Sequence, residues 1–168
     1  MKIEFKEKQR FTQWWLWLVL IGTGVLPIFG IYKQIILGEK FGSKPMSDFG
    51  LIIFCLSFFG VIALFWFMRL KTEIDQNEIR IDFFPFVKKR MHWKEIKNAE
   101  IVDYGFVGGW GIRFWPKYGT VYNTKGSMGL AIELLNGKKI LIGTQKETEL
   151  NKTVEMLMDK NSDHCTTE

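Results

Sequence analysis

Two long stretches without ionisable side chains dominate the N-terminal part of this chain. They run from Trp14 to Tyr32 and from Phe49 to Met68. At a helical rise of about 1.5 Å per residue, each stretch is long enough to cross the roughly 30 Å hydrocarbon core of a bilayer. The sequence therefore predicts two membrane spans, arranged as a helical hairpin.

Two other interpretations of these stretches are a cleaved signal peptide for the first and a buried core helix for the second. A signal peptide has a shorter apolar region and a small-residue cleavage site, whereas the first stretch continues through Pro27 and Phe29 to Lys33. A soluble helix as apolar all round as residues 51–59 needs a larger surrounding protein than residues 69–168 provide. The membrane hairpin is the favoured interpretation.

The residues that flank the stretches predict their orientation. Aromatic residues typical of the membrane interface lie near the ends, namely Trp14, Trp15, Trp17, Tyr32 and Trp66. Four basic residues precede the first stretch, three lie in the connecting loop and six lie in residues 69–90. Because basic residues are enriched on the cytoplasmic side, the chain is predicted to be a multi-pass protein of the cell (inner) membrane with both termini cytoplasmic.

After the second stretch the pattern changes to alternation. Residues 78–83 alternate between polar and apolar, so their apolar side chains share one face of a predicted strand. Residues 70–74 are its predicted hairpin partner across the turn at 75–77. Further strands are predicted at residues 87–93, 99–104, 112–115, 120–123, 130–135 and 138–142. Asn136-Gly137 between the last two is typical of a tight hairpin.

One amphipathic helix is predicted near the C-terminus. Thr144 and Glu147 have the spacing of a capping box, which satisfies amide groups at a helix start. Apolar side chains then recur at helical spacing at Leu150, Val154, Leu157 and Met158. This predicts a helix of about four turns, followed by a flexible tail at residues 161–168.

Many short strands followed by one helix indicate an α+β membrane protein. Its predicted parts are a two-helix transmembrane hairpin and an antiparallel β-barrel or sheet capped by the C-terminal helix. The predicted domains are residues 1–70, an N-terminal arm and the hairpin with spans at 14–32 and 49–68; residues 71–160, a cytoplasmic domain; and residues 161–168, the tail.

Four segments, together with the paired spans, resemble a known family. They are Trp93–Ile96, Gly108–Arg113, Lys125–Gly129 and Asn136–Gln145. In these segments the chain is similar to the bacterial pleckstrin-homology-like (PH-like) membrane proteins of uncharacterised function. The resemblance implies that the cytoplasmic domain is PH-like. Because that family has no established reaction or ligand, the resemblance implies no functional residue.

The glycine-rich segment 105–111 marks one candidate binding site. Its glycines permit positive φ and close backbone approach, and Trp110, Trp115 and Tyr118 surround the cation Arg113. This group suits a headgroup or peptide, with Arg113 as the anion partner and the rings as walls. Alternatively, the glycines form bulges and corners of a bent sheet, and a tryptophan fills its core. We favour the structural interpretation.

The run Lys88-Lys89-Arg90 is a second candidate. Three cations near a membrane suit contact with anionic lipid. However, alternate residues of a strand point to opposite faces, so the three side chains cannot all reach one surface. A solvated strand edge that also favours the cytoplasmic orientation is the preferred interpretation.

The sequence contains no pattern that predicts catalysis, a cofactor or a metal. His92 has no cysteine or second histidine near it, and no Walker A or dinucleotide fingerprint occurs. Neither span contains the ionisable residues that usually mark an ion pathway. Residues 69–168 hold sixteen basic and fourteen acidic residues, which is no nucleic-acid footprint. We therefore expect neither an enzyme nor a nucleic-acid partner.

The predicted function is a non-enzymatic, membrane-anchored PH-like interaction module at the cytoplasmic face of the membrane. Its partners would be membrane lipids, through the two spans, and a protein or peptide. The alternatives are a sensor of anionic lipid or a small ligand, using Arg113 and the basic strand, and an accessory subunit of a membrane complex. Ser57, Gly60 and Ala63 form a small-residue ridge that permits close helix approach, but the sequence does not determine an oligomeric state.

The charge distribution gives a testable topology. Ten of the thirteen basic residues near the span ends lie outside the connecting loop, so we expect residues 41–48 outside the cytoplasm and residues 71–168 within it. A phosphatase reporter that is active only outside the cytoplasm should be inactive when fused at Cys165. The same reporter inserted in the 41–48 loop should be active, and strong activity at Cys165 would contradict the orientation.

Overall fold

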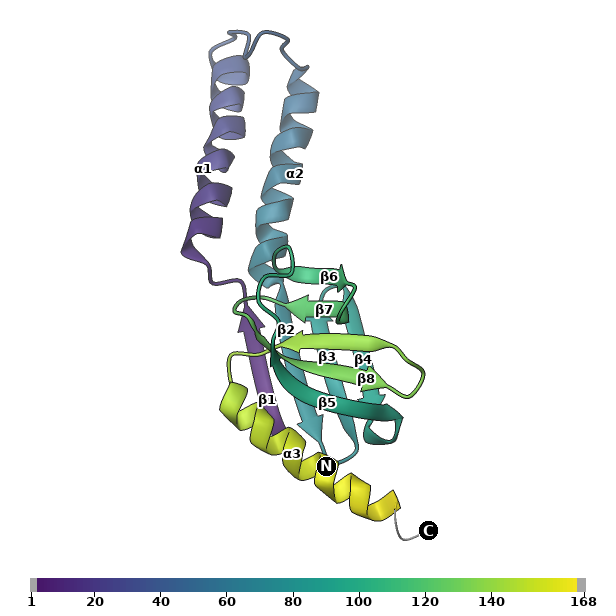
Figure 1. Cartoon of the computed structure of the whole chain (residues 1–168). Coiled ribbons are helices and arrows are strands. Elements are labelled where there is room, and N and C mark those ends of the chain that lie inside the picture. Colours follow the sequence, from purple (N-terminus) through teal and green to yellow (C-terminus); the bar gives the residue numbers. More distant parts are fainter. Residues whose placement is uncertain (1–2, 166–168) are drawn as a thin grey trace. The chain divides into compact units, whose positions relative to one another are not determined.

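The structure, a computed structural model, describes residues 3–165 and has two units (Figure 1). One unit, the hairpin, is Thr12–Phe67, and the other, the β-domain, is Met1–Phe11 together with Met68–Glu168. The hairpin is therefore inserted between the first strand of the β-domain and the rest of it. Because the two units are separate bodies, each is described by itself.

The hairpin consists of two long apolar helices. α1 is Trp14–Ile31 and continues as the π-helical segment η1, Tyr32–Ile36; α2 is Asp48–Phe67. Both helices are long and apolar enough to cross a membrane, and most of their side chains are exposed. Apolar helices with so little burial are unlike the core helix of a soluble protein, which confirms that the two predicted stretches are candidate spans.

Small residues of α1 provide the contact within the hairpin. A Cβ atom on Gly24 would lie 3.2 Å from Phe58, and one on Gly30 would lie 3.0 Å from Phe41. Gly60 of the predicted small-residue ridge has open space around it instead. The close packing of the helices therefore involves glycines of α1. Gly60 of the small-residue ridge on α2 makes no such contact.

The β-domain contains two sheets. The first sheet has the order β1-β2-β3-β4, with every pair antiparallel. Its strands are β1 Ile3–Arg10, β2 Arg69–Asp75, β3 Glu78–Phe84 and β4 Val87–His92. The second sheet has the order β5-β8-β9-β7-β6. Its strands are β5 Ile96–Asp103, β6 Gly111–Trp115, β7 Gly119–Asn123, β8 Met128–Leu134 and β9 Lys139–Gly143. Here β7 and β9 run parallel, and the other pairs are antiparallel.

The core lies between the sheets and under the C-terminal helix α3, Glu147–Cys165. Alternate side chains of the first sheet are buried, including Phe5, Leu70 and Ile81, and Phe83 meets Tyr122 of the second sheet with ring centroids 6.4 Å apart. Figure 1 shows α3 beside β1 and β5, which it contacts. Burial of Leu150, Val154 and Leu157 on α3 confirms the predicted apolar stripe.

The predicted strands from residue 70 onward are confirmed. Of the two predicted alternatives, a barrel or a sheet, the described strands form two separate sheets and no closed barrel. The short 3-10 helix η2, Trp93–Glu95, ends β4 and leads the chain to the second sheet. Its buried Trp93 donates from Nε1 to the Asp75 carbonyl oxygen, at 2.9 Å, which fixes this change of direction. Trp93 is thus part of a turn rather than of the predicted strand 87–93.

The N-terminal arm is a strand, which the sequence analysis did not predict. β1 pairs with β2 in antiparallel register, from Arg10 opposite Arg69 to Phe5 opposite Ile74. Two of its inward-facing positions are polar, Glu7 and Gln9, so the alternation of apolar residues that marks a half-buried strand is missing. The predicted domain boundary at residue 71 therefore leaves out β1 and the start of β2.

Polar inward side chains of β1 join the first sheet to the second. Gln9 donates from Nε2 to the Gly143 carbonyl at 2.7 Å and accepts at Oε1 from Thr124 Oγ1 at 2.8 Å. Glu7 accepts from Thr144 Oγ1 at 2.7 Å and from the Gln145 amide at 2.9 Å. Both side chains are buried, and each of these bonds replaces a contact with water that burial removes.

The segment that leads into α3 differs from the predicted capping box. The Thr144 amide donates to the Met128 carbonyl, as part of the sheet, and is not bonded to Glu147. The Thr144 hydroxyl accepts from the Lys146 amide at 3.0 Å. The helix begins at Glu147 and continues to Cys165, beyond the predicted end near residue 160. Residues 166–168 of the predicted flexible tail lie outside the described residues.

Glu7 gives a test of this connection. Glu7→Ala leaves the Thr144 hydroxyl and the Gln145 amide without their acceptor, which should lower the free energy of unfolding by about 1–3 kcal/mol. Glu7→Gln keeps one acceptor oxygen and should lose less. The control is Lys152→Ala, at an exposed position of α3. Thermal unfolding of the full chain in detergent measures the difference, and equal midpoints for all variants would contradict the assignment.

Candidate functional site

The structure divides the seven predicted contact residues among different surfaces. Lys88 and Arg90 are exposed on β4, on the face opposite to Lys89. Lys89 lies over the ring of Tyr122, with its Nζ 5.4 Å from the ring centroid. The alternation expected for the basic run is therefore present. Arg113 and Trp115 share one face of β6, while Trp110 precedes this strand and Tyr118 follows it.

The glycine-rich segment forms a corner that Asn123 holds in place. Gly105, Gly108, Gly109 and Gly111 all have positive φ, between +60° and +125°. Buried Asn123 accepts at Oδ1 from the Gly111 amide at 3.1 Å and donates from Nδ2 to the Tyr104 hydroxyl at 3.3 Å. The Tyr104 hydroxyl in turn donates to the Gly126 carbonyl at 3.0 Å. Burial raises the pKa of Tyr104, so this hydroxyl keeps its proton at neutral pH.

Several side chains around this corner pack against the backbone or against one another. A Cβ atom on Gly109 would lie 2.9 Å from Arg113 Nη2, so the arginine folds against a backbone that only glycine leaves open. Tyr118 packs against a buried cluster that includes Val121, and Lys117 lies over its ring at 4.9 Å. These contacts favour a corner of the sheet as the role of the glycines, but the expected tryptophan in the core is absent, because Trp115 is 38% exposed and Trp110 lines a hollow of 410 Å³ beside the corner.

A groove of 590 Å³ lies between β4 and the turns of the second sheet. Its lining residues come from β4, β6, β7, β9 and the connecting turns. They are Lys89, Phe114, Pro116, Gly119, Thr120, Gly137, Lys138, Lys139 and Ile140. Three of these are lysines, and none of these lining residues is an aspartate or glutamate. We refer to this feature as the lysine groove.

The strand β6 borders the lysine groove and is unusually exposed. It is the last strand of the second sheet in the part of the chain that the structure describes. Residues 112–115 are exposed on both faces of the strand, and the Phe114 side chain, which lines the groove, is 77% exposed. A sheet edge leaves backbone N–H and C=O groups unpaired. The groove therefore combines cations, an apolar wall and a strand edge.

Of the groove residues, Lys89 alone is among the contact residues predicted from the sequence. Phe114 lies within the predicted strand 112–115, and Lys138 and Lys139 lie within the predicted strand 138–142. No sequence pattern brings these three segments together. Their proximity depends on the parallel pairing of β7 with β9, which places Thr120 opposite Ile140.

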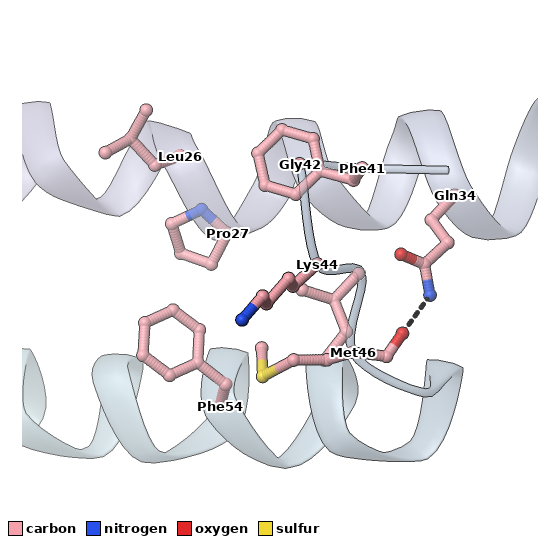
Figure 2. A pocket seen from close by; sticks show the side chains of 9 residues that line it. Leu26, Pro27, Gln34, Phe41, Gly42, Lys44, Met46 and Phe54 are labelled. Carbon is pink, nitrogen blue, oxygen red and sulfur yellow. Dashed lines mark hydrogen bonds between the residues drawn. The ribbon is translucent and has the colours of Figure 1, made fainter. Parts of the chain in front are cut away.

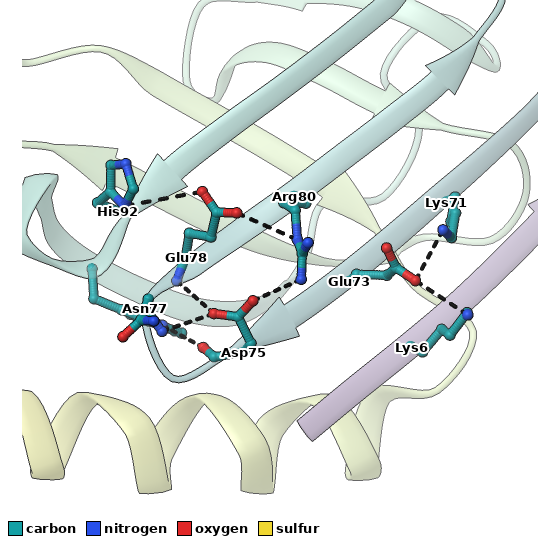
Figure 3. Close-up of polar contacts among 9 residues, drawn as sticks. Lys6, Lys71, Glu73, Asp75, Asn77, Glu78, Arg80 and His92 are labelled. Atoms are coloured by element: carbon teal, nitrogen blue, oxygen red, sulfur yellow. Dashed lines mark hydrogen bonds and ion pairs between the residues drawn. The ribbon is translucent and has the colours of Figure 1, made fainter. Parts of the chain in front are cut away.

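Other ionisable residues of the β-domain maintain its fold. Buried Asp75 accepts at Oδ1 from the amides of Asn77 and Glu78 and at Oδ2 from Arg80 Nη2 at 2.7 Å (Figure 3). These bonds fix the turn between β2 and β3. In the described residues, no group of three or more His, Cys, Asp and Glu side chains is arranged to hold a metal ion.

A smaller hollow of 210 Å³ lies within the hairpin (Figure 2). Leu26 and Pro27 of α1 face Phe54 of α2 across it, and the Lys44 side chain points into the space between them (Figure 2). Gln34 closes one end by donating to the Met46 carbonyl at 2.8 Å. The hollow is small and mainly apolar, so the lysine groove is the stronger candidate site.

Comparisons of the chain with protein-family models, with curated proteins and with solved structures found no match. The function is therefore inferred from the residues of the groove, and the PH-like resemblance stays a prediction.

Asn123 gives a test of the glycine corner. Asn123→Ala removes the bonds to Gly111 and Tyr104 and should cost about 1–3 kcal/mol of stability, because buried polar groups lose their partners. Hydrogen exchange should become faster at the amide of Gly111, whereas replacing the half-buried Asn151 of α3 by alanine should leave it unchanged. If the Gly111 amide exchanges equally fast in wild type and Asn123→Ala, the corner is not held by this side chain.

Proposed function

We propose that the chain is a non-enzymatic, membrane-anchored interaction module. In this proposal α1 and α2 cross the inner membrane, both termini are cytoplasmic, and the PH-like β-domain binds an extended segment of a protein partner along β6. The observation that carries the proposal is the lysine groove, where three lysines and exposed Phe114 border a free strand edge.

Strand addition explains how such a site would bind. An extended peptide that pairs with a sheet edge gains main-chain hydrogen bonds, while alternate side chains enter neighbouring pockets and give specificity. The lysines at 89, 138 and 139 favour acidic side chains, and Phe114 and Ile140 favour apolar ones. The partner segment expected here is therefore extended, with acidic and apolar residues.

The pairing of β1 with β2 supports the membrane topology. β1 precedes α1 and β2 follows α2, yet the two strands are hydrogen-bonded along most of their length. A chain that crosses a membrane twice between them meets this requirement, because both flanking segments then emerge on the same side. The basic residues of these strands favour the cytoplasmic side.

The roles of the buried carboxylates support a non-enzymatic function. Asp75 accepts three hydrogen bonds within the β2–β3 turn, and Glu7 accepts two from the segment that leads into α3. Each carboxylate thus has a structural role that accounts for its burial.

Photo-crosslinking in cells tests the proposal on the full chain. A photoreactive phenylalanine analogue at position 114 should crosslink to a protein, whereas the same analogue at Met156 on α3, which is 52% exposed, should not. The crosslink should disappear when Lys89, Lys138 and Lys139 are all replaced by glutamate. The matched charge control replaces Lys94, Lys152 and Lys160 by glutamate, because these lysines are exposed on η2 and α3.

Three results would overturn the proposed groove. They are the absence of a protein crosslink at position 114, a crosslink that the groove variant leaves unchanged, and a crosslink to lipid instead of protein.

A further inference from the structure

Outward-facing side chains of the first sheet form rows across the strands, and cations outnumber acids in these rows. β1 turns Lys6, Lys8 and Arg10 outward, on the face opposite to its buried residues. The register pairs then define one row across the sheet for each of these three residues. Because the strands are antiparallel, each row combines residues that are far apart in the sequence.

The two rows at one end of the sheet are strongly cationic. Arg10 lies opposite Arg69, which lies opposite Phe84. In the next row the register runs through Lys8, Lys71, Asp82 and Lys88. Among the described residues of these two rows there are five cations and one acid. We refer to Lys8, Arg10, Arg69, Lys71 and Lys88, with Phe84 and Phe86 of the β3–β4 turn, as the cationic rim.

Farther along the strands, acids pair with some of the cations. The third row runs in register through Lys6, Glu73, Arg80 and Arg90. Here Glu73 pairs with Lys6 at 3.2 Å and with Lys71 at 2.9 Å, and Arg80 pairs with Asp75 at 2.7 Å (Figure 3). Although burial opposes ionisation, the hydrogen bonds and charges of Lys71 and Lys6 hold the pKa of Glu73 below its usual range. Beyond this row lie the acids Asp75 and Glu78. Glu73, Asp75 and Glu78 therefore lie away from the end that carries the cationic rim, where Asp82 is the acid in register.

Within the rim, cations face one another without enough acids to separate them. Arg10 is directly opposite Arg69, and Lys8 is directly opposite Lys71. Like charges in such positions destabilise a sheet. An anion bound between them relieves that repulsion, so the rim is suited to anionic groups.

The surroundings of Arg69 also suit an anionic group. Its guanidinium lies over the Phe84 ring, 5.2 Å from the centroid, and its Nε is buried with no hydrogen-bond partner in the described part of the chain. A buried donor without a partner is uncommon. Arg69 therefore has donor capacity that the described residues do not use.

The covalent chain keeps the rim near the ends of the two long helices. Arg10 is followed by Phe11, Thr12 and Gln13 before α1 begins at Trp14, and Arg69 comes two residues after Phe67, the last residue of α2. Since an extended chain spans at most about 3.6 Å per residue, the ends of both strands stay close to the ends of the spans. Exposed Phe84 and Phe86, at 39% and 55%, lie on the same edge as these arginines.

We propose that the cationic rim contacts the anionic phospholipid headgroups of the membrane that α1 and α2 cross. Its cations bind headgroup phosphates, and Phe84 and Phe86 enter the interface between headgroups and acyl chains, where aromatic rings are favoured. This inference rests on the membrane anchoring in the proposed function but not on its lysine groove.

The test uses the full chain in nanodiscs. Cys55 and Cys165 are replaced by serine, and an environment-sensitive fluorophore is attached at Phe86→Cys. Discs contain phosphatidylcholine alone or with phosphatidylglycerol. We expect a blue shift and protection from acrylamide quenching in the anionic discs, both lost at high salt because salt screens charge beyond a few ångströms. Inorganic phosphate added to phosphatidylcholine discs should not reproduce the shift, which separates lipid from free phosphate.

Two sets of variants show which cations act. Lys8→Gln, Lys71→Gln and Lys88→Gln together should abolish the shift, whereas Lys94→Gln, Lys152→Gln and Lys160→Gln together, with the same change of charge, should preserve it. An unchanged thermal midpoint shows that the rim variant is folded. If that variant is unfolded, the salt and lipid dependence of the wild-type chain decides the question.

A different result contradicts each part of the two proposals. Equal emission in both types of disc, or a shift that the rim variant retains, overturns the rim. A chain that does not incorporate into nanodiscs overturns the anchoring. Loss of the crosslink at position 114 with an intact lipid shift overturns the groove alone.

Discussion

The pairing of β1 with β2 is the interaction on which the rest of the molecule depends. It joins the segment before α1 to the segment after α2, so the two ends of the hairpin are fixed in one sheet. It also brings Glu7 and Gln9 to the second sheet and to the segment that leads into α3. Without this strand, β2 would be an exposed edge, and three of the outward-facing cations would be absent from the face they share.

Most of the fold follows from local sequence patterns. The strands β2–β9 are predicted by alternation of polar and apolar residues or by turn residues at their ends. The helix α3 is predicted by apolar residues that recur with a period of 3.6. β1 lacks this signal because its inward positions include Glu7 and Gln9, whose burial depends on partners more than a hundred residues away. The open sandwich also could not be predicted, since it depends on η2 and on the parallel pairing of β7 with β9.

The candidate site was predictable only in part. The sequence drew attention to Arg113 and the aromatic residues near it, yet glycines at positive φ and buried Asn123 account for that segment as a corner. The lysine groove depends on three turns or strands that no spacing connects, and its apolar wall, Phe114, lies on the other face of β6 from Arg113. The charge of the first sheet could not be predicted either, because the near-balanced total for residues 69–168 conceals the excess of cations in the sheet's outward-facing rows.

β4 shows how one short strand can serve two surfaces. Its successive residues Lys88 and Lys89 point to opposite faces, one to the cationic rim and the other to the lysine groove. Strand geometry therefore places the proposed lipid contact and the proposed partner site on opposite faces of β4, although the two side chains are neighbours in the sequence. A domain held by its rim at the bilayer would keep the groove on a different face, and a partner could then enter it without displacing lipid.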